Sequence, residues 1–351
     1  MTTNLPIDAV LDEVRTTLLH SPNLLLIAEP GAGKTTRVPL ALLDQPWLHG
    51  KRIIMLEPRR VAARNAALFM AAQLNENVGQ RVGYRMRLEH KVSASTRIEV
   101  VTEGILTNML QDDPALSNVG LVIFDEFHER HLASDLGLAL CLQSQQLFND
   151  QLRLLVMSAT LDESALLTIM DAQVIRSPGR GFPITTFYRP AKDANERLTA
   201  HLSRVLSEAL QNSEGDVLVF LPGTADIRHA QNHLASFHPN CVVLPLHGQL
   251  SDRDQKQALQ PDTQQLRKII LSTNLAESAL TIDGVSIVID SGLERRLRFK
   301  PSAGLSELVT QGISCASATQ REGRAGRQSP GTCYRLYSDT QLQQRPDHIR
   351  P

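Results

Sequence analysis

Several features that define other classes of protein are missing from this sequence. Only four cysteines occur in 351 residues, far apart and without a C-x-x-C or Cys/His cluster, so the sequence predicts reduced thiols and neither a disulfide framework nor a zinc site. No apolar run approaches the roughly 20 residues of a membrane span. Residues 1–23 also lack the basic start and long apolar core of a signal peptide, so we expect no membrane association and a cytoplasmic location.

An excess of charge of one sign is missing as well. The net charge is −1, with 17 basic and 20 acidic side chains in residues 1–180 and 19 and 17 in residues 181–351. This balance does not exclude a nucleic-acid partner, because the position of the charges matters more than their sum. Local basic clusters occur at residues 51–64, 81–97 and 295–300, although such clusters are more often solvated faces than binding sites.

Aromatic residues make up only 4% of the chain, but 42% is apolar and 21% charged, as in an ordinary soluble globular protein. A length of 351 residues exceeds one ordinary core and predicts two domains. The Pro- and Gly-rich stretch Ser177–Pro183 marks the boundary, so we expect domains at 1–180 and 181–351.

The first half alternates short apolar runs with helix-like segments, which predicts an α/β fold with a parallel sheet covered on both faces. The expected strands are 24–28, 53–57, 98–102, 121–125, 154–158 and 173–175, and the expected helices 34–44, 59–73, 103–111, 133–147 and 162–169. Polar motifs follow several of these strands, and ligands bind at the carboxyl ends of parallel strands.

The second half repeats the α/β pattern without a second phosphate-binding loop. The expected strands are 217–221, 242–246, 269–272, 285–290 and 331–337, and the expected helices 196–210, 224–236, 251–259 and 317–326. Two extended runs, 295–300 and 305–310, flank Pro301-Ser302-Ala303-Gly304 and predict a β-hairpin.

The stretch from Ala28 to Thr36 predicts a nucleotide-binding P-loop between a strand and a helix. Backbone N–H groups of such a loop bind phosphate oxygens, which the positive end of the following helix also attracts. Lys34 would neutralise β/γ-phosphate charge, and the Thr35 hydroxyl would hold Mg²⁺. The first glycine of the pattern is replaced by Ala28, and a turn that merely contains Gly-Lys-Thr is the alternative. The predicted nucleotide-binding residues are Gly31, Ala32, Gly33, Lys34, Thr35 and Thr36.

Asp125 and Glu126 end the strand expected at 121–125. Beside a P-loop, Asp125 would hold Mg²⁺ and Glu126 would contact the metal site and deprotonate the attacking water. The alternative is a surface acidic pair that caps the next helix. Ser158-Ala159-Thr160 ends the next strand; by itself it indicates only a helix N-cap, but here Ser158 and Thr160 could hydrogen-bond His128 and relay the nucleotide state.

Gln320, Arg324 and Arg327 fall at i, i+4 and i+7, which places them on one face if residues 317–326 form a helix. Arginines that stabilise γ-phosphate charge act as arginine fingers in phosphoryl transfer. The alternative, a solvated basic helix, leaves Gly323 and Gly326 unexplained, since two glycines in such a segment suggest close packing against another surface.

Taken together, these motifs resemble a known family. The order Gly-Ala-Gly-Lys-Thr-Thr, Glu-Pro-Arg-Arg-Val-Ala-Ala-Arg, Thr-Glu-Gly-Ile-Leu, Asp-Glu-Phe-His-Glu-Arg, Ser-Ala-Thr, Leu-Val-Phe-Leu-Pro-Gly, Ser-Thr-Asn-Leu-Ala-Glu-Ser and Gln-Arg-Glu-Gly-Arg-Ala-Gly-Arg is similar to that of superfamily 2 helicases. The chain resembles the DEAH/RHA group most, and within it the bacterial HrpB-type ATP-dependent helicases, over about residues 20–340.

The resemblance implies two tandem RecA-like domains with ATP and Mg²⁺ between them, and a strand-separating hairpin at 295–310 inserted in the second. It implies catalytic roles for Glu126, Gln320, Arg324 and Arg327. It also implies a helicase core without the C-terminal domains of its relatives. Phe127 stands where many relatives have Ala, a tolerated variation, and Leu293 stands near where relatives often offer an aromatic residue to the adenine. No Gln-based adenine-reading motif precedes the P-loop, so we expect weak selectivity among nucleoside triphosphates. The implied nucleic-acid contacts are Arg59, Arg60, Thr102, Gly223 and Thr273.

The residues favour an ATP-driven helicase or translocase over two alternatives. A nucleic-acid-binding scaffold without hydrolysis does not require the intact set of Lys34, Asp125, Glu126, Arg324 and Arg327. A P-loop ATPase that acts on proteins leaves the Pro-Arg-Arg and Thr-Glu-Gly motifs without a role. The residues themselves leave RNA and DNA open, because backbone contacts carry little base information, and the resemblance favours single-stranded RNA and a monomer.

Overall fold

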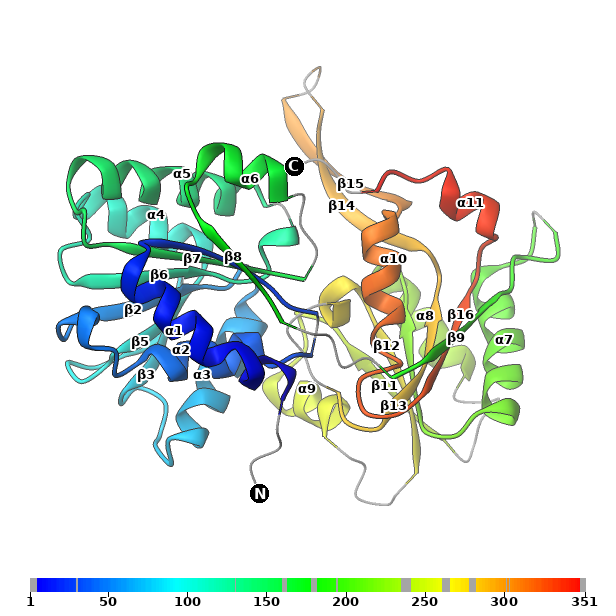
Figure 1. Cartoon of the computed structure of the whole chain (residues 1–351). Helices are drawn as coiled ribbons and strands as arrows, with labels where there is room; N and C mark the ends of the chain where they lie inside the picture. Colours follow the sequence, from blue (N-terminus) through cyan, green and yellow to red (C-terminus); the bar gives the residue numbers. More distant parts are fainter. Residues whose placement is uncertain are drawn as a thin grey trace. The chain divides into compact units, whose positions relative to one another are not determined.

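The computed structural model describes residues 5–347 apart from 30, 130, 160–162, 178–181, 194, 235–240, 261–265, 278–281, 301 and 303 (Figure 1). The chain folds into two compact units; one runs to residue 180 and the other begins at residue 181. Each unit is built on its own sheet.

The first unit contains an eight-stranded sheet in the order β4-β3-β5-β2-β6-β7-β1-β8. All neighbouring strands are parallel except β3 and β4, which form an antiparallel edge. The strands are β1 (Asn23–Ile27), β2 (Arg52–Leu56), β3 (Val82–Met86), β4 (Glu89–Lys91), β5 (Ile98–Val101), β6 (Val119–Phe124), β7 (Arg153–Ser158) and β8 (Gln173–Arg176).

Helices cover both faces of this sheet, as the near-continuous apolar strands require. The odd and even positions of the strands enter two separate core clusters, for example Leu24 and Leu26 on one face and Leu25 on the other. The first cluster packs against α1 (Leu11–His20), α2 (Lys34–Leu42) and α3 (Arg60–Gln73), and the second against α4 (Glu103–Asp112), α5 (Leu132–Leu147) and α6 (Glu163–Ile169). Short 3₁₀ helices are η1 (Pro6–Val10), η2 (Pro46–Leu48) and η3 (Phe127–Glu129).

The second unit contains a six-stranded parallel sheet in the order β11-β12-β10-β13-β16-β9. Its strands are β9 (Ile184–Tyr188), β10 (Asp216–Phe220), β11 (Cys241–Leu246), β12 (Arg267–Ser272), β13 (Val285–Asp290) and β16 (Gly331–Arg335). The helices are α7 (Leu198–Asn212), α8 (Thr224–Leu234), α9 (Asp252–Leu259), η4 (Asn274–Glu277), α10 (Cys315–Glu322) and α11 (Asp339–Gln343), with α7 and α8 packed on one face of the sheet. None of the helices in the described part of the chain has the length and apolar character needed to cross a membrane.

The predicted hairpin forms a separate two-stranded antiparallel sheet of β14 (Leu293–Lys300) and β15 (Leu305–Gly312). It projects from the second unit (Figure 1). Its strands are longer than the sequence indicated, and Leu297 faces Leu308 in register. The two tandem α/β units and this inserted hairpin agree with the fold class predicted from the sequence.

The predicted helix over 317–326 is wrong at its C-terminal end. Helix α10 ends at Glu322, so Arg324 and Arg327 do not continue its face. The backbone instead turns toward β9, where the Phe182 N–H donates to the Gly326 carbonyl at 2.9 Å. A Cβ at Gly326 would lie only 2.7 Å from both the Phe182 oxygen and Ile184 Cγ1, so close packing rather than a helical face explains this glycine.

Replacement of Gly326 by alanine should therefore destabilise the second unit. Overpacking of this kind costs about 1–3 kcal/mol, and thermal unfolding followed by circular dichroism should show a lower midpoint. Gly323→Ala is the matched control, because its Cβ would meet only ordinary contacts at 3.4 Å or more, with φ at −57°. Equal midpoints for the two variants would contradict the packing explanation.

Candidate nucleotide-binding site

Three neighbouring strands of the first unit end at one edge in polar segments. β6, β7 and β1 are adjacent in the sheet, and the Asp125-Glu126 pair, Ala159 and the P-loop follow them in turn. The Ala28 N–H donates to the Ser158 carbonyl at 2.9 Å and fixes the start of the loop beside the end of β7. The topology thus brings three sequence motifs to one place.

The P-loop owes its shape to two glycines and to a segment that precedes it. Gly31 and Gly33 have φ of 88° and 94°, which only glycine adopts without strain. A Cβ at Gly33 would also lie 2.6 Å from Leu5 Cδ1, and the Ile7 N–H donates to the Ala32 carbonyl at 3.1 Å. Ala28 is not among the described residues with positive φ, so its position does not require the expected glycine. The contact of this loop with η1 was not predicted from the sequence.

Two buried pairs connect the P-loop to the end of β6. Lys34 Nζ lies 3.2 Å from Glu126 Oε1, with both side chains at most 6% exposed. The Thr35 hydroxyl donates to Asp125 Oδ2 at 2.6 Å. Glu126 has φ of 50°, and its N–H donates to Asp125 Oδ1 at 2.8 Å. This turn aims the two adjacent carboxylates at different P-loop side chains.

The pKa values of Asp125 and Glu126 are shifted in opposite directions by their surroundings. Burial, together with the charge of Glu126, raises the pKa of Asp125 to about 7. Burial acts on Glu126 in the same direction, but the Lys34 ammonium, together with the neighbouring His128 side chain, outweighs it and holds the pKa of Glu126 below its ordinary value. Such a divided pair is typical of sites in which one carboxylate acts as a base. Glu126 is therefore ionised and available as a proton acceptor.

His128 joins the Asp-Glu segment to the segment after β7. Burial lowers the pKa of His128, which keeps the imidazole neutral. Its Nδ1 accepts a hydrogen bond from the Ala159 N–H at 3.2 Å, so its Nε2 carries the proton and points to Glu126 Oε2 at 3.3 Å. The sequence analysis predicted that Ser158 and Thr160 could hydrogen-bond His128. In the structure the backbone N–H of Ala159 makes such a hydrogen bond, and Thr160 lies outside the described residues.

The oxygen atoms of this site fit a magnesium ion. Thr35 presents a hydroxyl, and Asp125 and Glu126 present carboxylates, the hard donors that Mg²⁺ prefers. The described part of the chain contains no cluster of three or more His, Cys, Asp or Glu side chains arranged for a metal. A cluster of that size is not needed here, because Mg²⁺ in nucleotide sites is held by one or two protein ligands, by water and by the phosphates.

Glu57 was missed by the sequence analysis. It follows β2, the neighbour of β6, and is fully buried without a hydrogen-bond partner among the described residues for either carboxylate oxygen. Burial first, and then the charges of Asp125 and Glu126, raise its pKa well above the ordinary value. Its position after a buried strand and directly before Pro58 was the available signal.

The next residues contain two predicted nucleic-acid contacts. Arg59 forms an ion pair with Glu129 at 3.1 Å, whereas Arg60 is exposed. Glu129 also contacts His131 Nε2 at 2.8 Å. The guanidinium of Arg59 is thus attached to the segment that contains Glu126 and His128.

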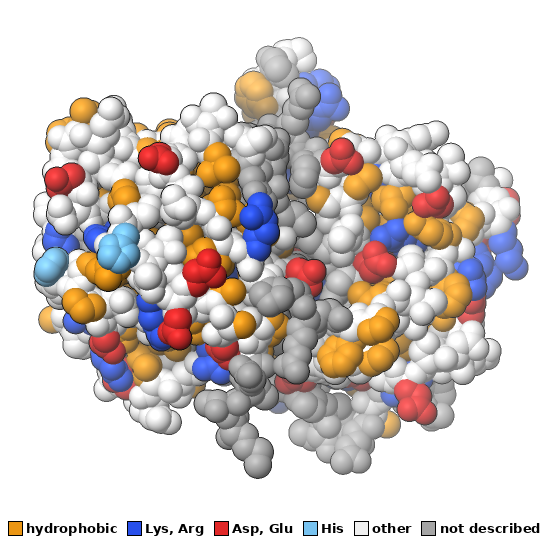
Figure 2. Space-filling model, viewed as in Figure 1, with side chains coloured by type: hydrophobic (Ala, Val, Ile, Leu, Met, Phe, Trp, Pro, Cys, Tyr) orange, Lys and Arg blue, Asp and Glu red, His pale blue; other side chains and the backbone are white. Residues whose placement is uncertain are grey.

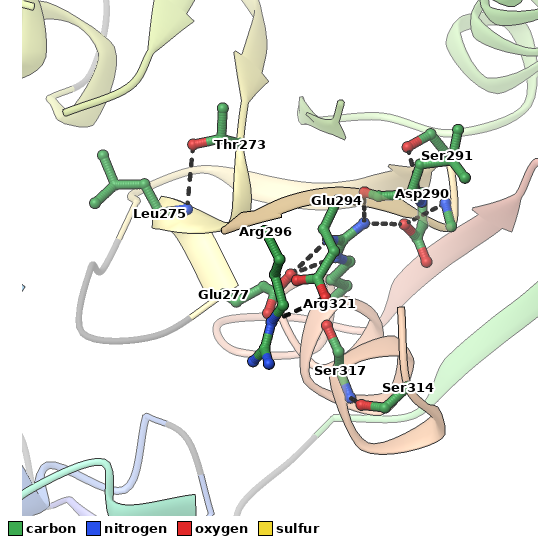
Figure 3. Close-up of polar contacts among 12 residues, drawn as sticks. Thr273, Leu275, Glu277, Asp290, Ser291, Glu294, Arg296, Ser314, Ser317 and Arg321 are labelled. Carbon is green, nitrogen blue, oxygen red and sulfur yellow. Dashed lines mark hydrogen bonds and ion pairs between the residues drawn. The ribbon is translucent and has the colours of Figure 1, made fainter. Parts of the chain in front are cut away.

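In the second unit, Arg321 forms the centre of a buried polar network (Figure 3). Its Nε donates to Glu277 Oε1 at 2.6 Å, and a terminal nitrogen donates to Asp290 Oδ1 at 2.7 Å and to the Leu293 carbonyl at 3.2 Å. The Tyr337 hydroxyl donates a hydrogen bond to the other carboxylate oxygen, Asp290 Oδ2, at 2.7 Å. The network joins α10, η4, the end of β13 and the base of the hairpin, and was not anticipated from the motif.

The predicted catalytic residues of the second unit lie around this network. Gln320 is buried on α10, and Arg324 and Arg327 follow the helix. The Glu277 carbonyl accepts hydrogen bonds from Nε of Arg324 at 3.0 Å and from one of its terminal nitrogens. Glu277 therefore holds Arg321 with its side chain and Arg324 with its backbone.

The remaining predicted nucleic-acid contacts also follow strand ends. Thr102 is the residue before α4, after β5. Gly223 and Thr273 follow β10 and β12, which are adjacent in the second sheet. Thr273 accepts a hydrogen bond from the Leu275 N–H at 3.4 Å (Figure 3).

Comparison with known proteins supplies a family. Residues 10–168 match the model described as DEAD/DEAH box helicase, and residues 198–329 match that of the helicase conserved C-terminal domain. The chain is 49% identical, over 99% of its length and 43% of the relative, to the ATP-dependent RNA helicase HrpB of Escherichia coli strain K12. It is 37% identical, over 96% of its length and 30% of the relative, to the probable ATP-dependent RNA helicase DHX34 of Mus musculus.

A solved structure gives the same result for the fold. The crystal structure of the Escherichia coli DEAH/RHA helicase HrpB matches with a TM-score of 0.94 and 48% identity, over 99% of this chain and 44% of that one. The chain thus spans less than half the length of the curated relatives it matches.

The buried carboxyl of Glu57 generates a test of stability. Because its pKa is raised, the folded protein favours the protonated form, and stability falls as pH rises above the ordinary carboxyl value of 4.5. Glu57→Gln removes this penalty, so without Mg²⁺ and nucleotide its unfolding midpoint should exceed the parent's by at least about 2–4 °C at pH 8, the effect of about 1 kcal/mol, and by less at pH 5.

Glu99→Gln is the control for that measurement. Glu99 is equally buried but contacts Arg52 at 3.0 Å and Arg85 at 2.7 Å, so loss of its charge should lower the midpoint. A Glu57→Gln variant that is less stable than the parent at pH 8 would show that the carboxylate is needed in its charged form.

Proposed function

This chain belongs to the DEAD/DEAH box helicase family, and we propose on that basis that it couples ATP hydrolysis to movement along single-stranded RNA. The observation that carries the proposal is the buried arrangement of Lys34, Glu126 and His128 beside the Thr35–Asp125 pair. This arrangement supports hydrolysis of a nucleoside triphosphate, which uses a P-loop lysine on the phosphates and a positioned residue that acts on the attacking water.

In this proposal the P-loop binds the phosphates of ATP. The N–H groups from Gly31 to Thr36 surround the phosphate oxygens, and the Lys34 ammonium exchanges its contact with Glu126 for the β- and γ-phosphates. Thr35 and Asp125 would hold Mg²⁺, which neutralises phosphate charge. Release of Glu126 from Lys34 leaves its carboxylate directed by the Nε2–H of His128.

Glu126 then accepts a proton from the attacking water as the water oxygen bonds to the γ-phosphorus. The bond from that phosphorus to the β,γ-bridging oxygen breaks in the same step, which leaves ADP and inorganic phosphate. Arg324 and Arg327 stabilise the charge on the γ-phosphate, and Gln320 positions the water. The contact of Arg324 with the Glu277 carbonyl supports its role, because it limits the orientations of the guanidinium. His128, Ser158 and Thr160 would transmit the nucleotide state to the polymer-binding residues.

RNA is the proposed polymer, because the two curated relatives are named RNA helicases. Arg59, Arg60, Thr102, Gly223 and Thr273 would contact its phosphates. The four free cysteines support an assignment to the reducing cytoplasm. The experiment that tests the function is the ATPase rate with poly-RNA, with single-stranded DNA and without polymer; the largest stimulation should come from RNA.

Glu126→Gln should keep ATP binding and lose turnover. The amide has the shape of the carboxylate but cannot accept the proton, and general-base catalysis contributes about 10²–10⁴-fold. Steady-state ATPase rates and ATP affinity should be measured on the same preparation. A rate within about threefold of the parent excludes the general-base role.

Arg324→Ala and Arg327→Ala should each lower ATP turnover by orders of magnitude with a smaller change in ATP affinity. An arginine finger contributes roughly 10³–10⁵-fold, mainly in the transition state. Arg228→Ala, an exposed arginine on α8, is the control and should turn over normally. A variant that loses ATP binding but keeps its full kcat would show that its arginine acts in binding instead.

A further inference from the structure

An arginine at the base of the hairpin covers one of the predicted nucleic-acid contacts. Gly223 is buried, and the Arg295 side chain lies over it: a Cβ at Gly223 would be 3.0 Å from Arg295 Cδ, 3.1 Å from Nε and 3.3 Å from Cζ. Gly223 is not among the glycines with positive φ, so its backbone conformation does not require glycine. The absence of a side chain is what allows Arg295 to lie this close.

The same sheet edge contains the second predicted contact of this unit. Phe220 of β10 pairs with Ser272 of β12, and the Leu221 N–H donates to the Ser272 carbonyl at 2.8 Å. The loops that contain Gly223 and Thr273 therefore leave the sheet side by side. Arg295 places a guanidinium at this edge, although it comes from a different element, β14.

Arg295 differs from the adjacent Arg296 in making no ion pair with the described residues. Arg296 contacts Glu294 at 3.2 Å, and Arg298 lies opposite Glu307 in the register. Arg295 lies opposite Thr310 and is exposed, and within the described ranges it makes no ion pair or hydrogen bond. Its charge is thus available to an anion, and packing on Gly223 already restricts its stem.

We propose that Arg295 is a phosphate-binding residue that contacts the RNA backbone together with Gly223 and Thr273. A strand that approaches the Gly223 loop meets this guanidinium first, which donates to phosphate oxygens with fork geometry. The contact would connect the loop after β10 to the base of the hairpin, so a translocating strand would move both together. This inference rests on the proposed function and adds a residue to its binding site.

The test is the salt dependence of RNA binding by the intact chain. Arg295→Gln and the parent are titrated with fluorescent oligouridylate at several salt concentrations. Loss of one phosphate contact should weaken binding about tenfold at low salt and lower the slope of log K against log salt by about 0.7. Arg253→Gln, an exposed arginine on α9, controls for net charge and should leave the slope unchanged.

A double-mutant cycle tests the geometry. A Cβ at Gly223 displaces the Arg295 side chain, so Gly223→Ala should weaken RNA binding in the parent and have a smaller effect in the Arg295→Gln background. Additive effects would show that the two residues act independently and would overturn the proposal. Thermal unfolding should be the same for Arg295→Gln and the parent, because the side chain is exposed.

Two further outcomes separate this inference from the function on which it rests. If Arg298→Gln lowers affinity and slope as much as Arg295→Gln, the hairpin attracts RNA through its general charge and Arg295 has no special position. If Arg295→Gln binds like the parent while RNA still stimulates the ATPase, the inference fails and the proposed function stands. If the parent neither binds RNA nor responds to it, the proposed function itself fails.

Discussion

The buried ion pair between Lys34 and Glu126 is the interaction on which the nucleotide site depends. Removing two charges from water costs several kcal/mol for each ion, so such a pair persists only where further hydrogen bonds hold it. Here His128 supports Glu126, and the Thr35–Asp125 contact supports the neighbouring carboxylate. In the proposed function, a triphosphate offers Lys34 a stronger anionic partner, so its binding would release Glu126 from Lys34.

The second unit also contains a buried charge, Arg321, which two acidic residues stabilise. Glu277 and Asp290 keep the pKa of this guanidinium above its ordinary value although burial acts in the opposite direction. The network positions Arg324 through the Glu277 carbonyl and the hairpin through the Leu293 carbonyl. Arg321 therefore positions both a proposed catalytic arginine and the base of the projecting hairpin. Figure 2 shows hydrophobic and basic side chains on this hairpin.

The fold and most of the nucleotide site could be predicted because buried parallel strands are continuous apolar runs and because their polar residues follow at one edge. Lys34, Asp125 and Glu126 were predicted in this way, and the structure brings them together. Glu57 was not, since a single acid gives no pattern until burial and neighbours are known. The end of α10 was misplaced because helical spacing was read across Gly323 and Gly326, whereas packing against Phe182 determines that turn. The contact of Arg295 with Gly223 joins residues 72 positions apart and leaves no local signal.

The hydrogen bond from the Ile7 amide to the Ala32 carbonyl gives the P-loop a built-in reporter. Ile7 belongs to η1, which directly precedes α1. Its amide hydrogen is protected from exchange with solvent only while the P-loop keeps the Ala32 carbonyl within hydrogen-bond distance. Deuterium uptake at Ile7 therefore measures how often the empty loop opens. If phosphate binding rigidifies the loop, the slowing of exchange at this single amide reports the conformational entropy that the ligand removes.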